Sequence, residues 1–370
     1  MTHRRAKESL IASAMTVLAL IAVVALAADA EREPPVTLVE TGLYADSGER
    51  QLAAGVESFT VQYPLWSDGA HKRRWIALPP GTTIDASDPD AWHFPAGTRI
   101  WKEFLLDGRR IETRYMELQA DGEWQFASYR WNEDESAATR VGPRGVKRAA
   151  ESAPGVPYSI PGVVECRACH SSGRSPVLGF STLQLSSDRD PNAPHATPPE
   201  AGSLDLDALV RRGLVLGLPE DLASTPPRVR AASPIARAAL GYLHGNCSNC
   251  HHAESPIASL GLSLTVRADG TAEALETAVD CASQYRPTGT EIQSRIVPGR
   301  PDQSLLIARV MSRNPVRQMP PMGSHRIDEQ GVALLSRWIA EELAFPPEAS
   351  GQTAVSPLAH ASETTPENVP

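Results

Sequence analysis

Two pentapeptides, at residues 166–170 and 247–251, have the sequence C-x-x-C-H, which is the attachment signature of a c-type haem. Two thiols that add to the two vinyl groups of one porphyrin must lie about one helical turn apart, which is the spacing of these cysteines. The histidine that follows then supplies the proximal ligand of the iron. We therefore predict two covalently bound haem c groups, attached through Cys166, Cys169, Cys247 and Cys250 and ligated by His170 and His251.

Zinc and disulfides are the alternatives for these cysteines. Compact zinc sites separate two CxxC pairs by about 15–20 residues, whereas 77 residues lie between Cys169 and Cys247. Neither alternative explains a histidine after both pairs. The fifth cysteine, Cys281, is expected to be a small buried residue, with a free thiol or an intermolecular partner as the other interpretations.

The start of the chain resembles an export signal. Residues 1–30 hold a basic segment with Arg4, Arg5 and Lys7, then a mostly apolar stretch of 19 residues, which is long for a signal peptide and near the length of a spanning helix. We expect a signal peptide, with a retained anchor in the inner membrane as the alternative. In both cases we expect the rest of the chain to be periplasmic, where covalent haem attachment occurs in bacteria.

The overall charge is acidic. The formal net charge is −9, and residues 1–27 carry +2, so the chain without them is near −11. This excess argues against nucleic acid as a partner and favours a basic redox partner protein.

Residues 41–160 have the pattern of a β-domain. Alternating runs at 58–63, 74–78, 98–104, 110–116 and 123–129 are separated by turn signals, including Asp107-Gly108 and Asp121-Gly122, and Asp-Gly between alternating runs indicates a hairpin. Six of the seven tryptophans lie in this region. We predict a mainly-β domain, sandwich or barrel-like, with an aromatic core.

The remainder predicts an α+β, multidomain chain. Residues 161–230 carry the first haem motif in a loop-rich segment, with one helix at 204–214. Residues 231–345 predict an all-α domain like a class I cytochrome c. Ser233 caps and Pro234 starts a helix that leads into Cys247, a second helix covers 303–311, and a last helix starts at Asp328. The tail at 346–370 is expected to be disordered.

Met319 is the predicted second axial ligand of the second haem. It precedes two prolines, which push it into extended backbone and stiffen its loop. Met322 and His325 are the competing ligands, and His252 is taken as a surface residue. For the first haem an open sixth position is one alternative, and the candidate ligands are His195, Met116, His71, His93 and His244.

Several segments resemble a family of exported dihaem c-type cytochromes of bacteria. The resemblance covers about residues 40–345 and rests on 63–70 (YPLWSDGA), 94–98 (FPAGT), 101–104 (WKEF), 111–114 (IETR), 129–134 (YRWNED) and 242–246 (YLHGN). Residues 297–299 (VPG) and 304–306 (SLL) are also similar to haem domains of planctomycete-type cytochromes. The resemblance implies haem binding and electron transfer and names no substrate.

We expect an electron carrier rather than an enzyme. A dihaem peroxidase is one alternative, because it needs a haem with an open distal position, although the 81-residue motif spacing and the β-domain are unlike it. A cytochrome subunit of a dehydrogenase is the other, and the polar residues available to it in the β-domain are Asp68, His71, Glu103, Glu112 and Asp134.

Overall fold

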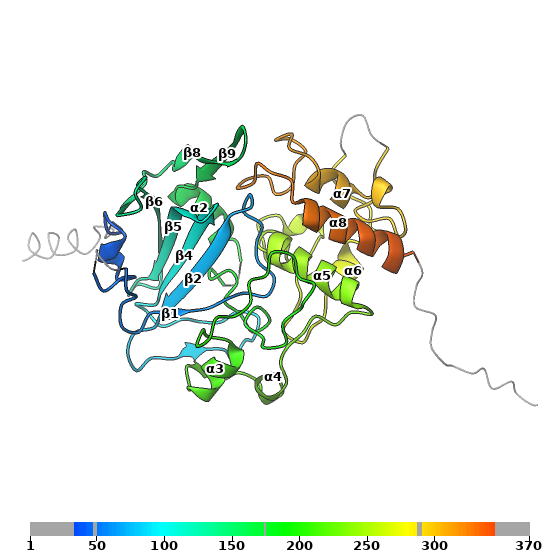
Figure 1. The fold of residues 1–370 in the computed structure, drawn as a ribbon. Coiled ribbons are helices and arrows are strands. Elements are labelled where there is room, and N and C mark those ends of the chain that lie inside the picture. The colour runs from blue at the N-terminus through cyan, green and yellow to red at the C-terminus, as the bar shows by residue number, and fades with distance from the viewer. Residues whose placement is uncertain (1–32, 47–49, 174, 287–290, 345–370) are drawn as a thin grey trace, which may run out of the picture.

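An open six-stranded antiparallel sheet dominates the first half of the protein in the computed structural model, which describes residues 33–46, 50–173, 175–286 and 291–344 (Figure 1). The strand order is β1-β2-β4-β5-β6-β7. The strands are β1 (Glu57–Ser58), β2 (His71–Ala77), β4 (Arg99–Leu106), β5 (Arg109–Leu118), β6 (Trp124–Trp131) and β7 (Ala138–Arg140). Two smaller pairs are β3 (Ile84–Asp85) with β10 (Val215–Leu216), and β8 (Val146–Ala153) with β9 (Val156–Ile160).

The predicted strands agree with β2, β4, β5 and β6 to within a few residues. Asp107 and Gly108 both have positive φ, 49° and 81°, as the turn of a two-residue hairpin requires. The run at 58–63 is different, because only its first residue is in a strand. After Ser58 the backbone is bound instead to Gln184, which lies in a later loop. The Gln62 N–H donates to the main-chain oxygen of Gln184 at 3.1 Å, and the Tyr63 N–H donates to its side-chain oxygen at 3.0 Å.

The main sheet is open, which differs from the sandwich or barrel that we expected. Its edge strands in the described chain are β1 and β7. Both faces are nevertheless covered, because helices and loops take the place of a second sheet. Ile76, Ile100, Met116 and Phe126 on the inner face pack against Phe180, Leu185 and Leu209, and Trp75, Trp101, Tyr115 and Tyr129 on the outer face pack against Leu38 and Leu43.

Helices follow the sheet in sequence. The first is α2 (Val163–His170), then α3 (Leu206–Arg211) and α4 (Glu220–Ser224). The last part contains α5 (Pro234–Cys247), α6 (Ala274–Thr277), α7 (Leu305–Val310) and α8 (Glu329–Arg337), which continues as a short π-helix, Trp338–Glu342. Ser233 Oγ accepts the N–H of Ala236 at 3.1 Å and Asp328 Oδ1 that of Gly331 at 3.0 Å, so the two predicted caps are present.

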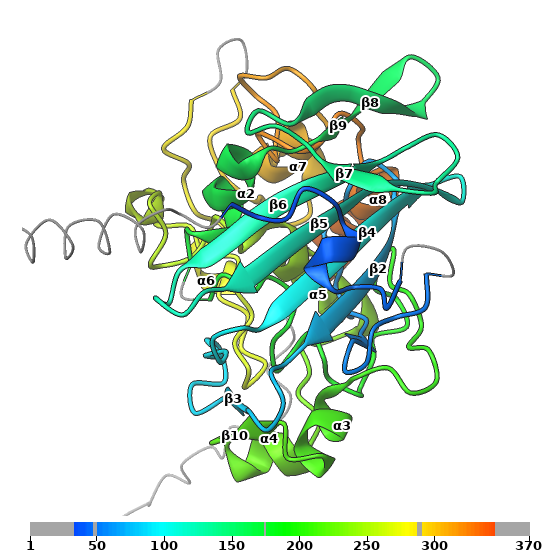
Figure 2. The ribbon, with the colours of Figure 1, turned by 90° about the vertical axis from the view of Figure 1, so that its left-hand side faces the viewer.

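The helical part, α5 to α8, lies behind the inner face of the sheet (Figure 2). The segment around Tyr63 lies between the sheet and the helical part. The backbone of α5 packs directly against this segment, because α5 has glycines at the points of contact. A Cβ on Gly241 would lie 2.0 Å from Tyr63 Cε1, and one on Gly245 would lie 2.3 Å from the Tyr63 carbonyl oxygen. The two glycines therefore permit this close packing.

Candidate haem sites

The first CxxCH motif forms the C-terminal half of α2, which packs on β6. Its N-terminus is closed by Glu165, whose carboxylate accepts the N–H of Gly162 at 2.8 Å. Cys166 is 9% exposed and belongs to the same apolar cluster as Met116 and Phe126. The His170 ring lies 5.3 Å from the Phe126 ring, measured between centroids.

His170 has the hydrogen bond that a haem ligand needs. Its Nδ1 lies 2.7 Å from the carbonyl oxygen of Pro176. A carbonyl can only accept, so Nδ1 carries the proton and the lone pair of Nε2 is available. Burial lowers the pKa of His170 to about 4, which keeps the ring neutral, as metal ligation requires.

The second motif continues α5 beyond its last residue. The N–H groups of Cys250 and His251 donate to the carbonyl oxygen of Cys247 at 3.1 and 2.9 Å, which folds the motif into a helical turn. Burial, followed by the charges of Arg309 and Arg295, lowers the pKa of His251 to about 4. Its Nδ1 is buried and finds no hydrogen-bond partner in the described part of the chain.

The two motifs touch, although their first cysteines lie 81 positions apart in the sequence. The thiols of Cys169 and Cys250 interact, and this interaction raises the pKa of Cys169 and lowers that of Cys250 to about 7. The Ser172 hydroxyl lies 3.0 Å from the Cys169 carbonyl oxygen and 2.9 Å from that of Asn249, so it donates between the motifs. Two groups attached to these cysteines would therefore be close neighbours.

The residues present fit a haem at each motif. The thiols of each motif lie one helical turn apart, both histidines are neutral, and each ring keeps a nitrogen free of protein partners. A zinc site made from both cysteine pairs would need several of these side chains at one point. No group of three or more His, Cys, Asp or Glu able to hold a metal ion occurs within the described ranges.

Met319 lies in the loop between α7 and α8, and its backbone is bound to α7. Its N–H donates to the carbonyl oxygen of Arg309 at 3.0 Å, and Arg309 is one of the charges that acts on His251. The competing residues point to the surface: Met322 is 45% exposed, and His325 is exposed with its Nε2 3.2 Å from Ser159 Oγ.

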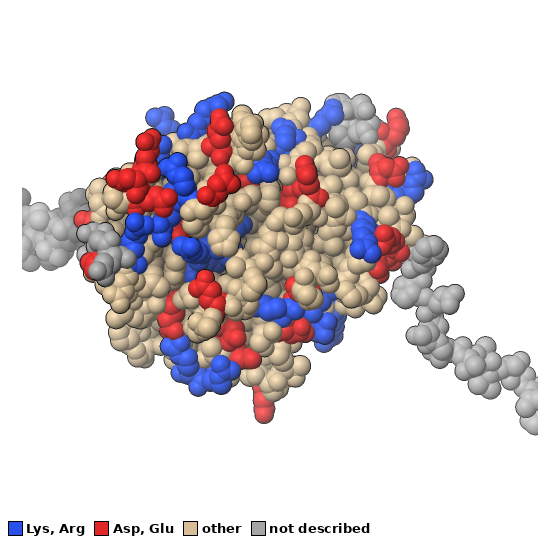
Figure 3. Space-filling model, in the orientation of Figure 1, with Lys and Arg blue, Asp and Glu red and all other residues tan. Residues whose placement is uncertain are grey.

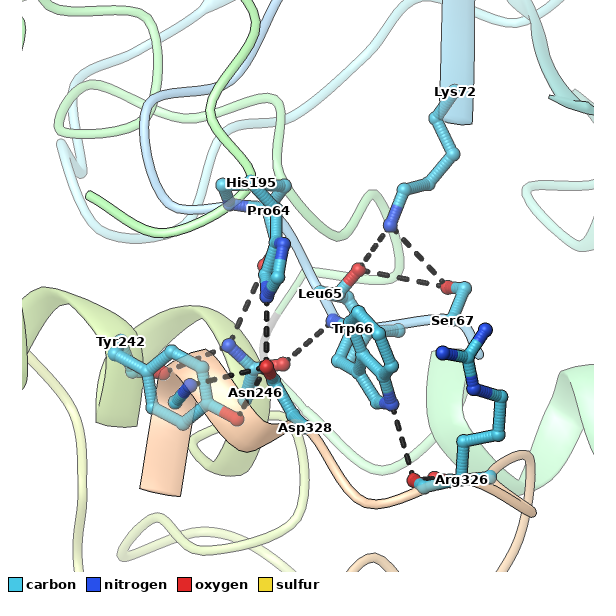
Figure 4. Close-up of polar contacts among 12 residues, drawn as sticks. Pro64, Leu65, Trp66, Ser67, Lys72, His195, Tyr242, Asn246, Arg326 and Asp328 are labelled. Atoms are coloured by element: carbon cyan, nitrogen blue, oxygen red, sulfur yellow. Dashed lines mark hydrogen bonds and ion pairs between the residues drawn. The ribbon is translucent and has the colours of Figure 1, made fainter. Parts of the chain in front are cut away.

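Asp68, which lies just before β2, binds the loop between Met319 and α8. Its carboxylate, 3% exposed, accepts the backbone N–H groups of His325 and Arg326 at 2.9 Å and the Ser324 hydroxyl at 3.3 Å. The segment 63–70 thus connects the sheet to the loop between Met319 and α8. Figure 4 shows further contacts of this segment, in which Trp66 donates its backbone N–H to Asn246 Oδ1 at 2.6 Å and its indole N–H to the Arg326 carbonyl oxygen at 3.3 Å.

The candidate sixth ligands of the first haem are scattered. His195 donates through Nε2 to the carboxylate of Asp328 at 2.9 Å (Figure 4). His244 accepts the N–H of Val266 at 3.1 Å through Nδ1, which places its proton on Nε2. His71 and His93 are exposed. Only Met116 shares a cluster with Cys166.

The polar residues proposed for a dehydrogenase site are also dispersed. Glu103 pairs with Arg110 at 2.9 Å, Glu112 pairs with Arg114 at 2.7 Å, and the Asp134 carboxylate accepts the N–H of Ser136 within a turn. His71 lines a cavity of about 200 Å³. Cys281 is partly exposed rather than buried, and its thiol donates to the carbonyl oxygen of Glu276 at 3.3 Å. His252 is partly buried beside Gly173.

Four cations on the inner face of the sheet, two buried and two partly buried, did not enter the sequence predictions. They are Lys72, Arg74, Lys102 and Arg114. The signal was available, because in each strand these residues alternate with the outward-facing side chains and so fall on the face that carries Ile76, Ile100 and Met116.

Comparisons of the chain with protein-family models, with curated proteins and with solved structures found no match. Within the ranges that the structure describes, no helix is long and apolar enough to span a membrane. The expected signal or anchor at 1–30 and the expected tail at 346–370 lie outside the described residues.

Proposed function

We propose that this protein is an exported, periplasmic dihaem c-type cytochrome that transfers electrons. The observation that carries the proposal is the contact between the two CxxCH motifs through Cys169, Cys250 and Ser172. Each haem, when bound, supplies a one-electron iron couple. The contact places the two attachment points together, so that an electron has a short path inside one molecule.

The chain's own residues have distinct roles in this proposal. Cys166 and Cys169 hold one haem, Cys247 and Cys250 the other, and His170 and His251 ligate the irons. The Pro176 carbonyl fixes the tautomer and orientation of His170. Met319 would complete the second site, and a His/Met pair raises the potential of a haem.

The test is spectroscopic and chemical. Expressed with a haem-ligation system, the protein should keep two haems after denaturation, detected by mass spectrometry and by haem staining of a gel. Replacing Cys247 and Cys250 together by Ala should remove one haem and leave the other. A zinc-bound or haem-free chain would contradict the proposal.

The spin state separates a carrier from an enzyme. For a carrier, both ferric haems should be low-spin in EPR and optical spectra, because a filled sixth position limits the reorganisation of the iron site. A high-spin haem that turns over peroxide rapidly would instead indicate a dihaem peroxidase.

A further inference from the structure

A row of cations crosses the inner face of the sheet in register. Arg74 on β2 pairs with Lys102 on β4, Lys102 pairs with Arg114 on β5, and Arg114 pairs with Ser128 on β6. Directly paired residues of antiparallel strands project from the same face and lie about 5 Å apart. The row therefore runs from β6 to β2 on one face of the sheet.

The row begins at the first CxxCH motif. Ser128 lies against Cys166: burial raises the pKa of that thiol, and the Ser128 hydroxyl acts in the opposite direction. Besides burial, the charges of Lys102 and Arg114 lower the pKa of His170. Both cations therefore lie close to the motif, and Arg74 lies one strand further away from it.

The four cations Lys72, Arg74, Lys102 and Arg114 have too few carboxylates beside them in the described chain for each to form an ion pair. Arg74 and Lys72 are each 8% exposed, and Lys102 is partly buried. Glu112, whose side chain is 0% exposed, pairs with Arg114, and the charge of the buried Asp328 acts on Lys72. Lys72 donates to the carbonyl oxygen of Leu65, and the Lys102 ammonium lies 5.3 Å from the centroid of the Phe104 ring. Within the described ranges the side chains of Arg74 and Lys102 form no hydrogen bond and no ion pair.

Structural ion pairing does not explain this arrangement. Arg114 is paired with Glu112, and Lys72 feels the opposing charge of Asp328, so Arg74 and Lys102 are left without a carboxylate in the described chain. An unpaired charge that loses part of its solvent is unfavourable. Burial lowers the pKa of Lys72 and Lys102 well below their usual range, so a carboxylate bound beside them would favour their charged forms. Arg74 and Lys72 also line the cavity of about 200 Å³, so there is space beside them.

We propose that this row binds the propionate carboxylates of the first haem, so that the sheet forms the propionate side of that site. The inference rests on the proposed function. The thioether bonds would hold one side of the porphyrin at Cys166 and Cys169, and the propionates project from the side away from the vinyl groups. Two carboxylates would then neutralise most of the excess charge. A free carboxylate or phosphate ion is the other source of the same chemistry, but it would not require the row to start at the motif.

The experiment compares three single variants of the holoprotein. R74Q and K102Q each remove one cation of the row. R73Q is the matched control, because Arg73 directly precedes Arg74 on β2 but projects from the opposite face of the sheet, where it pairs with Glu103 at 3.5 Å. Haem content is measured first, by mass, and the potentials of both haems are then measured by spectroelectrochemistry. Resonance Raman spectra report the propionate bending bands.

We expect two haems in every variant. A cation beside a haem favours the reduced iron, so R74Q and K102Q should each lower the equilibrium constant for reduction of one haem by about tenfold, equivalent to 59 mV for a one-electron couple. The propionate bands of the same haem should shift. R73Q should change neither, and R74K, which keeps the charge, should restore a nearly normal potential if R74Q folds poorly.

Three results would overturn the inference. Two haems with unchanged potentials and Raman bands in R74Q and K102Q would remove it and leave the proposed function intact. Binding of succinate or inorganic phosphate to the holoprotein, measured by calorimetry and abolished in R74Q, would assign the row to a free anion. A chain without haem would remove the inference together with the proposed function.

Discussion

The histidines of this protein differ in how their ring nitrogens are used. His170 donates from Nδ1 to a carbonyl, and this leaves Nε2 free, whereas His195 donates from Nε2 to Asp328 and His244 accepts at Nδ1. Neutral imidazole has one donor and one acceptor nitrogen, so the partner of one nitrogen determines the chemistry of the other. This distinction favours His170 over His244 as a ligand, because the acceptor nitrogen of His244 is already occupied by the Val266 N–H.

Met319 supports a prediction about one absorption band. A methionine thioether on ferric haem gives a weak band near the red end of the visible spectrum, and Met319→Ala should abolish it and lower the potential of one haem. Met322→Ala is the control, since Met322 is exposed. Loss of the band in Met322→Ala alone would move the ligand to Met322.

His244 should make the protein less stable in mild acid. Burial lowers its pKa to about 4 in the folded state, against about 6.5 in an unfolded chain. The unfolded state thus binds more protons between these values, and the stability that neutral His244 contributes is present above pH 6.5 and lost as the pH falls toward 4.

The check is the difference in free energy of unfolding between His244→Asn and the unaltered protein at each pH. Asparagine can accept the Val266 N–H but does not titrate in this range. The variant should lose less stability than the unaltered protein between pH 7 and pH 4.5, and His93→Asn, at an exposed position, should behave like the unaltered protein. Parallel curves for His244→Asn would contradict the assignment.

At the level of elements, short segments hold the helical part against the sheet. The segment 63–70 contacts α5 through Tyr63 and Trp66 and the loop before α8 through Asp68. Asp328 both caps α8 and accepts from Tyr242 of α5 at 2.9 Å. The loop 63–70 and the cap residue Asp328 therefore connect the sheet, α8 and α5, which leads into the second motif.

Asp68→Ala should weaken this connection. It leaves the N–H groups of His325 and Arg326 without their acceptor in a buried place, and we expect a loss of about 2–4 kcal/mol in the free energy of unfolding. Denaturant unfolding of the holoprotein measures it. Asp134→Ala is the matched control, because its carboxylate is exposed and bonds only within its turn. Equal effects of the two substitutions would show that Asp68 is not an anchor.

At the scale of the whole molecule, the two CxxCH motifs meet between the sheet and the helical part. Charged side chains of both signs are interspersed on the face shown in Figure 3, without a large region of one sign. The excess of acidic residues over basic ones, 44 against 35, therefore does not by itself locate a docking surface on that face.

The contact between the motifs predicts that the two haems influence each other's potential. Two charges about 10 Å apart interact by about 1–2 kcal/mol at an effective dielectric constant of 20. The potential of the first haem should therefore change in the Cys247→Ala, Cys250→Ala double variant, which lacks the second. Redox titrations of this variant and of the unaltered protein provide the comparison, and identical potentials for the first haem would contradict the contact.

Interactions within a few residues were readable from the sequence. Local patterns were sufficient to predict α5, α8 and the β4–β5 hairpin, because each depends on neighbours along the chain. These patterns are the caps Ser233 and Asp328 and the Asp107-Gly108 turn, and the spacing within each CxxCH motif is of the same local kind. Haem binding remains a prediction that rests on the same local pattern.

The tertiary structure alone decided which distant segments meet. Three features depend on strand register or on packing between segments far apart in the sequence. They are the contact of Cys169 with Cys250, the hydrogen bonds from residues 324–326 to Asp68, and the row of Arg74, Lys102 and Arg114. A one-residue change of register would turn every side chain of a strand to the other face, and the alternation within one strand does not say which strand lies beside it. For the same reason the open sheet, covered by loops and helices, was not distinguishable from a sandwich or barrel in the sequence.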